Sequence, residues 1–411
     1  MNKLKLIMCA SAATLGLGWA GAAAAQTAAP APAPAATPAA PAAPTPSPMA
    51  NPPITAPMAA NPFPTVVDAG PLGKITVDGV LTGLVGYQSP SPTFFGGPDR
   101  AAGFGDISNA QIIINKSDGV FQFYVQAGDY SLPALGATYF KAGVEPPQTF
   151  GYVPEGFIKI VPNAMWSVEA GALPTLIGDE YNFTFQNMNI ERGLLWGQEP
   201  AISTGVPVNF TQGPIAISVA YTDGYYSNTY SAISGLATYT FKNSDTLAFA
   251  GEGNVTTNHV STFATPLAQN NGEIFNLIYS HSAGPWSISP YLQYQSNPRV
   301  HGAFGVPLAA SASAWAGAVL TKYNFTPEIS VAGRVEYISS SGQQNILGFG
   351  AGSNAWSITV TPTYQKGVFF ARAEASYVSI GSGDSIDGDE FGQFGNHGSQ
   401  VRVLAETGID F

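Results

Sequence analysis

The sequence predicts an all-β fold, a closed antiparallel transmembrane β-barrel of about 16 strands with short periplasmic turns and long external loops. Apolar and polar residues alternate with a period of two through most of the chain, and charged residues make up only 10% of it. After the N-terminal segment, no apolar run reaches the roughly 18 to 20 residues that a spanning helix needs. A closed barrel is the other structure that satisfies all backbone polar groups within a membrane.

The chain begins with a segment typical of a secretory signal peptide. Two lysines precede an apolar run, and the small residues of AAAAQ place cleavage after Ala25, so we expect residues 1–25 to be removed. The single cysteine, Cys9, lies in this segment, which excludes disulfides and thiolate metal sites from the mature chain. Residues 26–65 are rich in Ala and Pro and predict a disordered periplasmic linker, because such a tract buries too little apolar surface to fold.

Residues 66–411 contain the alternating pattern and form the predicted barrel. In EISVAGRVEY, residues 328–337, every second residue from Ile329 is apolar or glycine, and the residues between them are small or charged. The predicted strands are 74–87, 104–115, 119–129, 153–161, 165–172, 202–211, 215–224, 231–242, 246–255, 272–283, 285–295, 313–324, 328–338, 354–362, 366–379 and 398–411. Counts of 14 or 18 strands also fit the pattern.

The connections between these strands alternate between short and long. KSDG, PNA, QGP, KNSD, AGP, FTP and YQKG are turn-rich and short, whereas most of the others are long. Outer-membrane barrels have short periplasmic turns and long external loops, and an even strand number places both termini on the periplasmic side. This arrangement predicts that the protein lies in the bacterial outer membrane.

The last strand ends on an aromatic residue. In VRVLAETGIDF, residues 401–411, Phe411 falls on the apolar face, and we expect it to lie in an aromatic belt at the periplasmic interface. A terminal Phe is also similar to the sorting signal that the barrel-assembly machinery recognises. Phe411 is therefore the predicted interface anchor and the predicted contact with that machinery.

If the apolar faces of the strands meet lipid, the polar faces line the lumen. Barrels of 16 to 18 strands leave an aqueous channel, so a charged interior predicts a pore. Arg334, Arg372 and Arg402 come from late strands and would face the passage opposite carboxylates. The alternative is that these arginines pair with Glu336, Glu374 and Glu406 and only satisfy the wall.

The loop that follows the fifth predicted strand, residues 173–200, is long and unusually apolar for an external loop. Apolar loop residues need a surface to pack against, so we expect this loop to fold inward and narrow the lumen. Asp179, Glu180, Glu191 and Arg192 would then join the arginines in a pore constriction. The alternatives are an external lid and a contact between the subunits of a trimer.

The same loop resembles the OmpL-like family of outer-membrane β-barrel porins of Gram-negative bacteria. The resemblance lies in a TLIG-x-E segment, an N-x-N-x-x-RG run and a P-x-x-x-x-GV element, which here span residues 175–206, and in the opening strand GKITVDGVLTGLVGYQ. It covers roughly residues 66–411 and implies a barrel more strongly than it implies a solute. By similarity to general porins, it also implies a homotrimer.

Other chemistry has weaker support. The acidic group Asp384, Asp387, Asp389 and Glu390 departs from EF-hand spacing, so we predict a solvated loop and no metal site. His281, with Ser280 or Ser282, is the only local candidate for a nucleophile and base, and neighbours in a strand point to opposite faces. We therefore expect no catalytic residues, no cofactor and no enzymatic activity.

The function predicted from these features is passive diffusion of small hydrophilic solutes or ions. The chain has 15 Lys and Arg against 26 Asp and Glu, which favours cations and argues against a nucleic-acid partner. The expected surroundings are outer-membrane lipid and lipopolysaccharide. The alternative is a non-conducting barrel for adhesion or envelope structure, and a surface lipolytic enzyme is a third, weaker reading.

Overall fold

The computed structural model of the chain describes residues 58, 61–90, 102–382, 391–392 and 395–411. The predicted signal peptide, most of the predicted linker and the acidic group at 384–390 fall outside this part. No helix among the described residues is long and apolar enough to cross a membrane.

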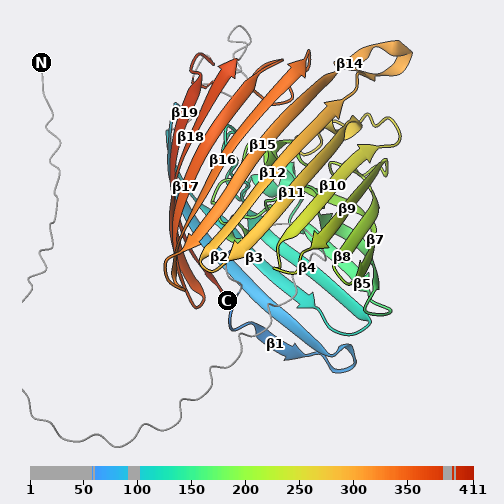
Figure 1. Cartoon of the computed structure of the whole chain (residues 1–411), viewed down its shortest axis with the longest axis vertical. Helices are drawn as coiled ribbons and strands as arrows, with labels where there is room; N and C mark the ends of the chain where they lie inside the picture. Colours follow the sequence, from blue (N-terminus) through green and yellow to red (C-terminus); the bar gives the residue numbers. More distant parts are fainter. Residues whose placement is uncertain (1–57, 59–60, 91–101, 383–390, 393–394) are drawn as a thin grey trace, which may run out of the picture. The chain divides into compact units, whose positions relative to one another are not determined.

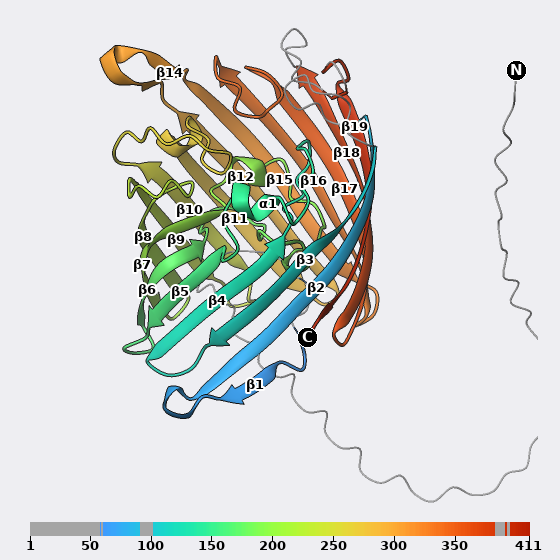
Figure 2. The same ribbon diagram turned by 180° about the vertical axis from the view of Figure 1, so that it is seen from behind.

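The strands form one sheet that curls into a closed barrel (Figures 1 and 2). Its 17 strands comprise β1 and the 16 strands of the wall, which confirms the predicted fold and strand number. The wall strands are β2 Lys74–Ser89, β3 Gly103–Lys116, β4 Phe121–Tyr130, β5 Glu155–Ile160, β6 Trp166–Pro174, β7 Ile202–Gln212, β8 Ile215–Thr222, β9 Ala232–Thr240, β10 Thr246–Asn254, β11 Glu273–Ala283, β12 Trp286–Asn297, β15 Ala312–Asn324, β16 Ile329–Gly342, β17 Asn354–Lys366, β18 Phe369–Ser382 and β19 Ser399–Asp410.

The barrel closes where the first wall strand meets the last. β19 pairs antiparallel with β2 up to Asp410 opposite Val80, and the Phe411 amide donates to the Gly79 carbonyl at 2.8 Å. Beyond that point the edge of β2 is taken by β1, Thr65–Asp68, with Thr65 opposite Val77. The chain is therefore already a strand at the last residue of the predicted linker.

Side chains alternate across the wall as the period of two requires. In β19, Val401 and Val403 on the outer face are 47% and 48% exposed, whereas Arg402 and Glu406 on the inner face are each 2% exposed. An outer face of Val, Ile, Leu and aromatic residues suits lipid, and the inner face holds most of the polar groups of the strands.

The short turns gather at one end of the barrel and the long loops at the other (Figure 1). The long-loop end also has a two-stranded hairpin, β13 Val300–His301 with β14 Pro307–Ala309, and one short helix, α1 Glu145–Gln148. The loop that was expected at 173–200 spans 175–201, because β6 continues to Pro174, which pairs with Ile202.

Aromatic side chains cluster near both ends of the strands. At the short-turn end the ring centroids of Trp286 and Tyr323 lie 4.6 Å apart, and Phe325 packs against Tyr323. Near the long-loop end, the centroids of Tyr294 and Trp315 lie 4.3 Å apart. These two belts match the interfacial girdles of membrane barrels.

Candidate functional site

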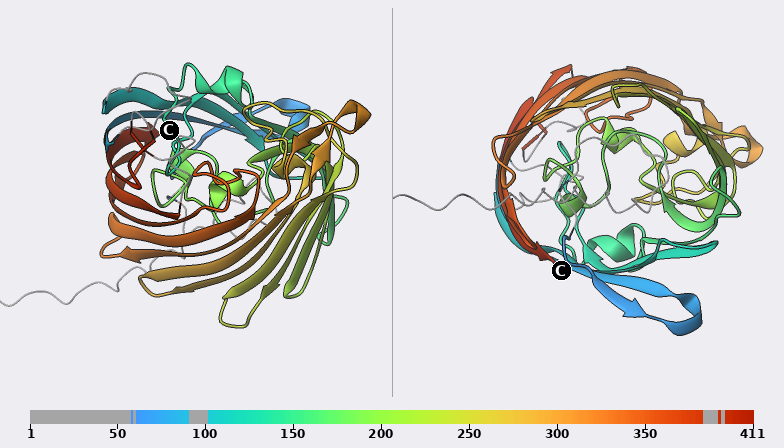
Figure 3. Two further views of the ribbon diagram at one scale, coloured as in Figure 1. Left: turned by 90° about the horizontal axis from the view of Figure 1, so that it is seen from above. Right: turned by 60° about the horizontal axis from the view of Figure 1, so that its bottom comes forward.

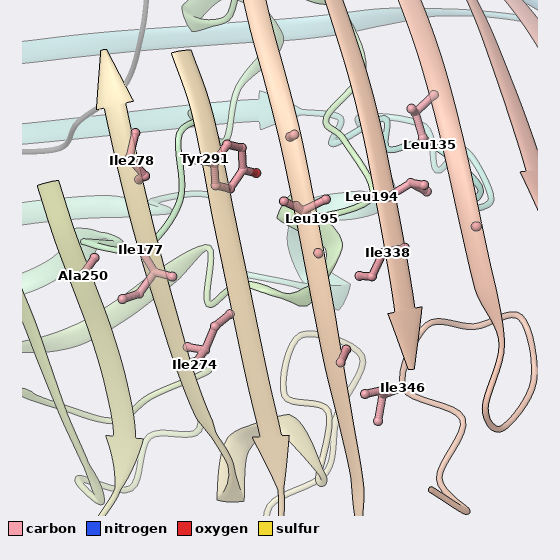
Figure 4. Close-up of a cluster of buried hydrophobic side chains, with 14 of the residues drawn as sticks. Leu135, Ile177, Leu194, Leu195, Ala250, Ile274, Ile278, Tyr291, Ile338 and Ile346 are labelled. Atoms are coloured by element: carbon pink, nitrogen blue, oxygen red, sulfur yellow. The ribbon is translucent and has the colours of Figure 1, made fainter. Parts of the chain in front are cut away.

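The loop between β6 and β7, residues 175–201 and here called the inner loop, lies inside the ring of strands (Figure 3). Its apolar residues explain this position. Ile177, Leu194 and Leu195 are at most 6% exposed and belong to a cluster with the wall residues Ile274 and Ile338 (Figure 4). Each buried aliphatic side chain of this kind contributes about 1.5–3 kcal/mol, which is a sufficient reason for the loop to leave the solvent.

Polar contacts fix the inner loop to the wall at three arginines, the first of which is Arg334 of β16. Its guanidinium donates to Glu180 at 2.5 Å and to the carbonyl of Glu191 at 2.7 Å, both in the loop, and to Glu336 of its own strand at 3.2 Å. Glu180 and Glu336 in turn accept from the loop amides of Gly193 and Leu195. Burial raises the pKa of Glu180, and Arg334 opposes that rise.

Arg372 of β18 forms the second anchor. It donates to Glu406 of β19 at 2.5 Å and to the loop carbonyls of Thr184 and Asn187 at 2.5 and 2.8 Å. Glu406 also accepts from the hydroxyl of Thr184 at 2.6 Å. One ion pair of the wall thus holds both the main chain and a side chain of the inner loop.

Arg402 of β19 forms the third anchor, and its carboxylate partner is Glu191 of the loop. The same guanidinium donates to the carbonyls of Ala134 and Ala137, in the loop that follows β4. Glu374 of β18 forms no ion pair with an arginine within the described part of the chain. It accepts from the amides of Ile190 and Glu191 at 2.6 and 2.9 Å instead.

Arg192 behaves differently from the other site residues. Its Nε and Nη2 atoms donate to the carbonyl of Pro133 at 3.1 and 2.9 Å, and burial lowers its pKa to about 10. Glu145 of α1 is 4% exposed, and burial raises its pKa to about 8 against the opposing effect of Arg192. The two groups lie in different loops and interact through their charges.

The structure brings the seven predicted constriction residues into one region, but it buries them. The largest exposed fraction among them is 4%. The three wall arginines lie in the contact between the inner loop and the wall, whereas Arg192 contacts the loop after β4. The residues and their exposed fractions are Asp179 1%, Glu180 3%, Glu191 0%, Arg192 0%, Arg334 1%, Arg372 4% and Arg402 2%. Of the wall carboxylates offered as the alternative, Glu336 pairs with Arg334 and Glu406 pairs with Arg372, while Arg402 pairs with Glu191 of the inner loop.

Sequence reasoning missed the contribution of the loop after β4, residues 131–154. Its Pro133 carbonyl accepts hydrogen bonds from Arg192, and its Ala134 and Ala137 carbonyls accept from Arg402. Its helix supplies Glu145. A backbone carbonyl has no signature in a sequence, and α1 is only 4 residues long with prolines at its start. The one signal in the sequence was a single charged residue, Glu145, within the otherwise uncharged segment AGVEPPQTF.

The remaining candidates lie away from the inner loop. Phe411 is 54% exposed on the outer face, and its ring covers Gly79. His281 lies near a short turn, where its Nδ1 is 2.7 Å from the Asp245 carboxylate.

Residues 74–411 match the family model described as "Putative beta-barrel porin-2, OmpL-like". No curated protein matches the chain. Among solved structures, the outer-membrane expressed OmpT of Vibrio cholerae is similar over 84% of this chain and 100% of its own, with a TM-score of 0.54 at 10% identity. A trimer form of OmpT has a TM-score of 0.53 at 9% identity, over 82% of this chain and 99% of that one. An anion-selective porin from Comamonas acidovorans has a TM-score of 0.51 at 11% identity, with the same coverage of 82% and 99%.

Proposed function

Because the chain belongs to the OmpL-like β-barrel porin family and lies in the outer membrane, we propose that it allows passive diffusion of small hydrophilic solutes or ions. The observation that carries this proposal is a closed barrel with an apolar outer face, a polar inner face and a loop folded inside. Diffusion down a gradient needs no cofactor and no catalytic group.

The seven site residues would act as a constriction by fixing the position of the inner loop. Their side chains are buried where the inner loop contacts the wall and the loop after β4. These residues therefore set how far the inner loop reaches into the lumen. Fixed dipoles and charges around a narrow passage select solutes by size and charge. In this proposal Asp179, Glu180, Glu191 and Arg192 belong to the loop side, and Arg334, Arg372 and Arg402 to the wall side.

Cation preference is the finer part of the proposal. It rests on the excess of 26 Asp and Glu over 15 Lys and Arg, which gives a net charge of −11. The fold itself does not decide the sign, since one similar barrel is an anion-selective porin. Charged groups near the passage decide it.

A non-conducting barrel is the second candidate, and one observation favours it. The inner loop buries its charges and packs an apolar cluster against the wall, so it fills part of the lumen. Such a barrel would serve adhesion or envelope structure through its external loops.

Planar bilayers with the purified full chain separate the two candidates. Stepwise currents support diffusion, and a silent bilayer at protein levels that insert into the membrane supports the non-conducting barrel. In asymmetric KCl, the sign of the reversal potential tests cation preference. We expect Asp179→Asn together with Glu180→Gln to weaken that preference, whereas Glu328→Gln, on an exposed turn, leaves it unchanged.

The proposed partners follow from the surface of the barrel. Outer-membrane lipid and lipopolysaccharide meet the apolar face, and the outward ring of Phe411 offers a terminal aromatic residue to the barrel-assembly machinery. A homotrimer is proposed because a similar barrel occurs as a trimer. Cross-linking in native membranes tests the trimer.

A further inference from the structure

Buried polar atoms without a hydrogen-bond partner are more numerous on one side of the inner loop than on the other, where Arg402 Nε, Arg192 Nη1 and Asn189 Oδ1 also lack one within the described residues. Toward β16, β18 and β19, the arginines and glutamates described above bond to loop amides, carbonyls or side chains. Toward β12, several buried polar atoms have no hydrogen-bond partner within the described part of the chain. They belong to Gln198, Glu199, Asn270, Tyr291, Gln295 and Asn297.

These groups are deeply buried. Gln295 and Asn297 are each 1% exposed, and in both side chains the amide oxygen and the amide nitrogen lack partners. Both carboxylate oxygens of Glu199 lack partners as well, although this residue is only 6% exposed. A buried polar group without a partner is costly, and native proteins leave few of them unexplained.

Contacts between neighbouring segments place the six residues around one region. Tyr291, Gln295 and Asn297 lie on the inner face of β12, where Gln293 completes a run at every second position from 291 to 297. Between them, Gln293 donates to the carbonyl of Leu195 in the inner loop at 3.3 Å. Tyr291 lies near enough to Glu199 to lower its pKa, although neither group reaches hydrogen-bond geometry.

The other side of the region is closed by the loop before β11. Tyr225 donates from its hydroxyl to the carbonyl of Gln198 at 2.7 Å, and its amide donates to Asn270 at 3.3 Å. The amide oxygen of Asn297 lies beside Gly272, two residues after Asn270. The region is therefore continuous from Tyr291 to Asn297.

The chemistry of the region is neutral and rich in both donors and acceptors. The four amide side chains of Gln198, Asn270, Gln295 and Asn297 and the phenol of Tyr291 are uncharged. Burial, with Glu180 and Asp179 nearby, raises the pKa of Glu199 well above its ordinary value, which favours the neutral form of its carboxyl. Hydroxyl groups, which both donate and accept, match such a surface better than ions do.

We propose that β12 and the Gln198–Glu199 end of the inner loop form a subsite for neutral polyhydroxylated solutes, such as small saccharides. The subsite is closed in this structure, because the orphaned atoms have almost no exposed surface. It opens when the Gln198–Glu199 end moves off β12, while the anchors on β16, β18 and β19 hold the rest of the loop. The inference deepens the proposed diffusion function by naming a solute class.

The test compares two probes of similar hydrodynamic size in planar bilayers: maltose, which has many hydroxyl groups, and a polyethylene glycol, which has mainly ether acceptors. In the wild type, maltose interrupts the ion current at lower concentration than the polymer. Gln295→Leu with Asn297→Leu weakens the maltose effect by about tenfold or more, as expected when several hydrogen bonds are lost. The matched control is Gln111→Leu, a buried inner-face glutamine of β3 whose amide bonds to Asn109 and Gln126.

The melting temperatures of the variants test whether they fold. Replacing a partnerless amide by an apolar group of similar size leaves the melting temperature unchanged or raised, whereas Gln111→Leu breaks two bonds and lowers it. Equal effects of maltose and polymer on the wild type, or an unchanged maltose effect in the double variant, overturn the subsite.

A bilayer that stays silent with the wild-type protein contradicts the diffusion function. The subsite is then tested by a binding measurement that needs no current. Trp196 lies two residues before Gln198, so its fluorescence in detergent reports maltose binding without any current once Trp166, Trp286, Trp315 and Trp356 are replaced by Phe. A saturable change that the double variant loses supports the subsite alone, and no change in the wild type overturns it.

Discussion

Arg372 is a charged side chain with almost no exposed surface, and it has three acceptors. Its contacts with Glu406, Thr184 and Asn187 join two strands to the inner loop. Removing one partner of a buried ion pair is far more damaging than the pair is stabilising, because the other charge stays buried without compensation.

Arg372→Gln should therefore lower the free energy of unfolding by about 3–5 kcal/mol. Arg299→Gln is the matched control, since Arg299 is exposed in a loop, and its effect should stay within about 0.5 kcal/mol. Urea unfolding of protein refolded in lipid vesicles measures both. Equal losses in the two variants would show that Arg372 does not anchor the loop.

Glu145 predicts a pH dependence. Burial raises its pKa in the folded protein to about 8, from 4.5, so folding favours the protonated form. Its contribution to the free energy of unfolding is complete below pH 4.5 and is lost as pH rises through 8. Between these two values the loss is about 1.4 kcal/mol per pH unit. Hydrogen exchange in residues 131–154 should therefore accelerate between about pH 5 and pH 8 beyond the intrinsic increase.

Glu145→Gln should remove that extra acceleration, because the amide stays neutral at every pH. Glu328→Gln, an exposed carboxylate on a short turn, should leave it in place. If the Glu145→Gln protein keeps the full pH effect, another group causes it.

At the scale of elements, the strands were predictable and the loop contacts only in part. The alternation in EISVAGRVEY predicts β16 and its inward side chains because a strand has a period of two. The apolar residues of the inner loop predict that it must be buried. Its partners could not be predicted, since Glu191 and Arg402 are 211 positions apart and which of several carboxylates each arginine takes depends on strand register.

Gly193 tests how tightly the inner loop is held. A Cβ at this position would lie 2.1 Å from Glu336 Oε1 and 2.8 Å from Glu180 Oε2, the two carboxylates around Arg334. Gly193→Ala should thus push the loop away from β16, whereas Gly197→Ala meets nothing within 4 Å. Arg192 is the only tryptic site in residues 175–201 and is fully buried. Trypsin should therefore cut the loop in the first variant and spare it in the second.

At the scale of the whole molecule, the alternation of connection lengths predicted a barrel with its termini at the short-turn end. The β1 strand escaped prediction, because TVVD is short and follows a Pro-rich tract. The position at which β1 pairs with β2 depends on where β19 ends along β2. That position is set by the closed wall and not by residues 65–68 alone.

The outer face gives a depth-dependent prediction. Ile358 lies in the middle of β17 and is 43% exposed, and Ile329 begins β16 beside a short turn and is 46% exposed. Arginine on the lipid face costs about 2–4 kcal/mol at the midplane and about 0–1 near the interface. Ile358→Arg should therefore destabilise the barrel in vesicles far more than Ile329→Arg. Equal losses would mean that this face does not meet the hydrocarbon.

β19 and β1 follow each other along one edge of β2, here called the seam, and this arrangement allows the order of the chain segments to be changed. Phe411 pairs with Gly79 and Thr65 with Val77, and both partners run antiparallel to β2, so only the position opposite Asp78 separates them. Pro64 would fill that position if Phe411 were joined to it directly. A circular permutant made by this single ligation, with new ends opened in the hairpin of β13 and β14, should keep an unbroken strand along the seam and fold into the same cylinder.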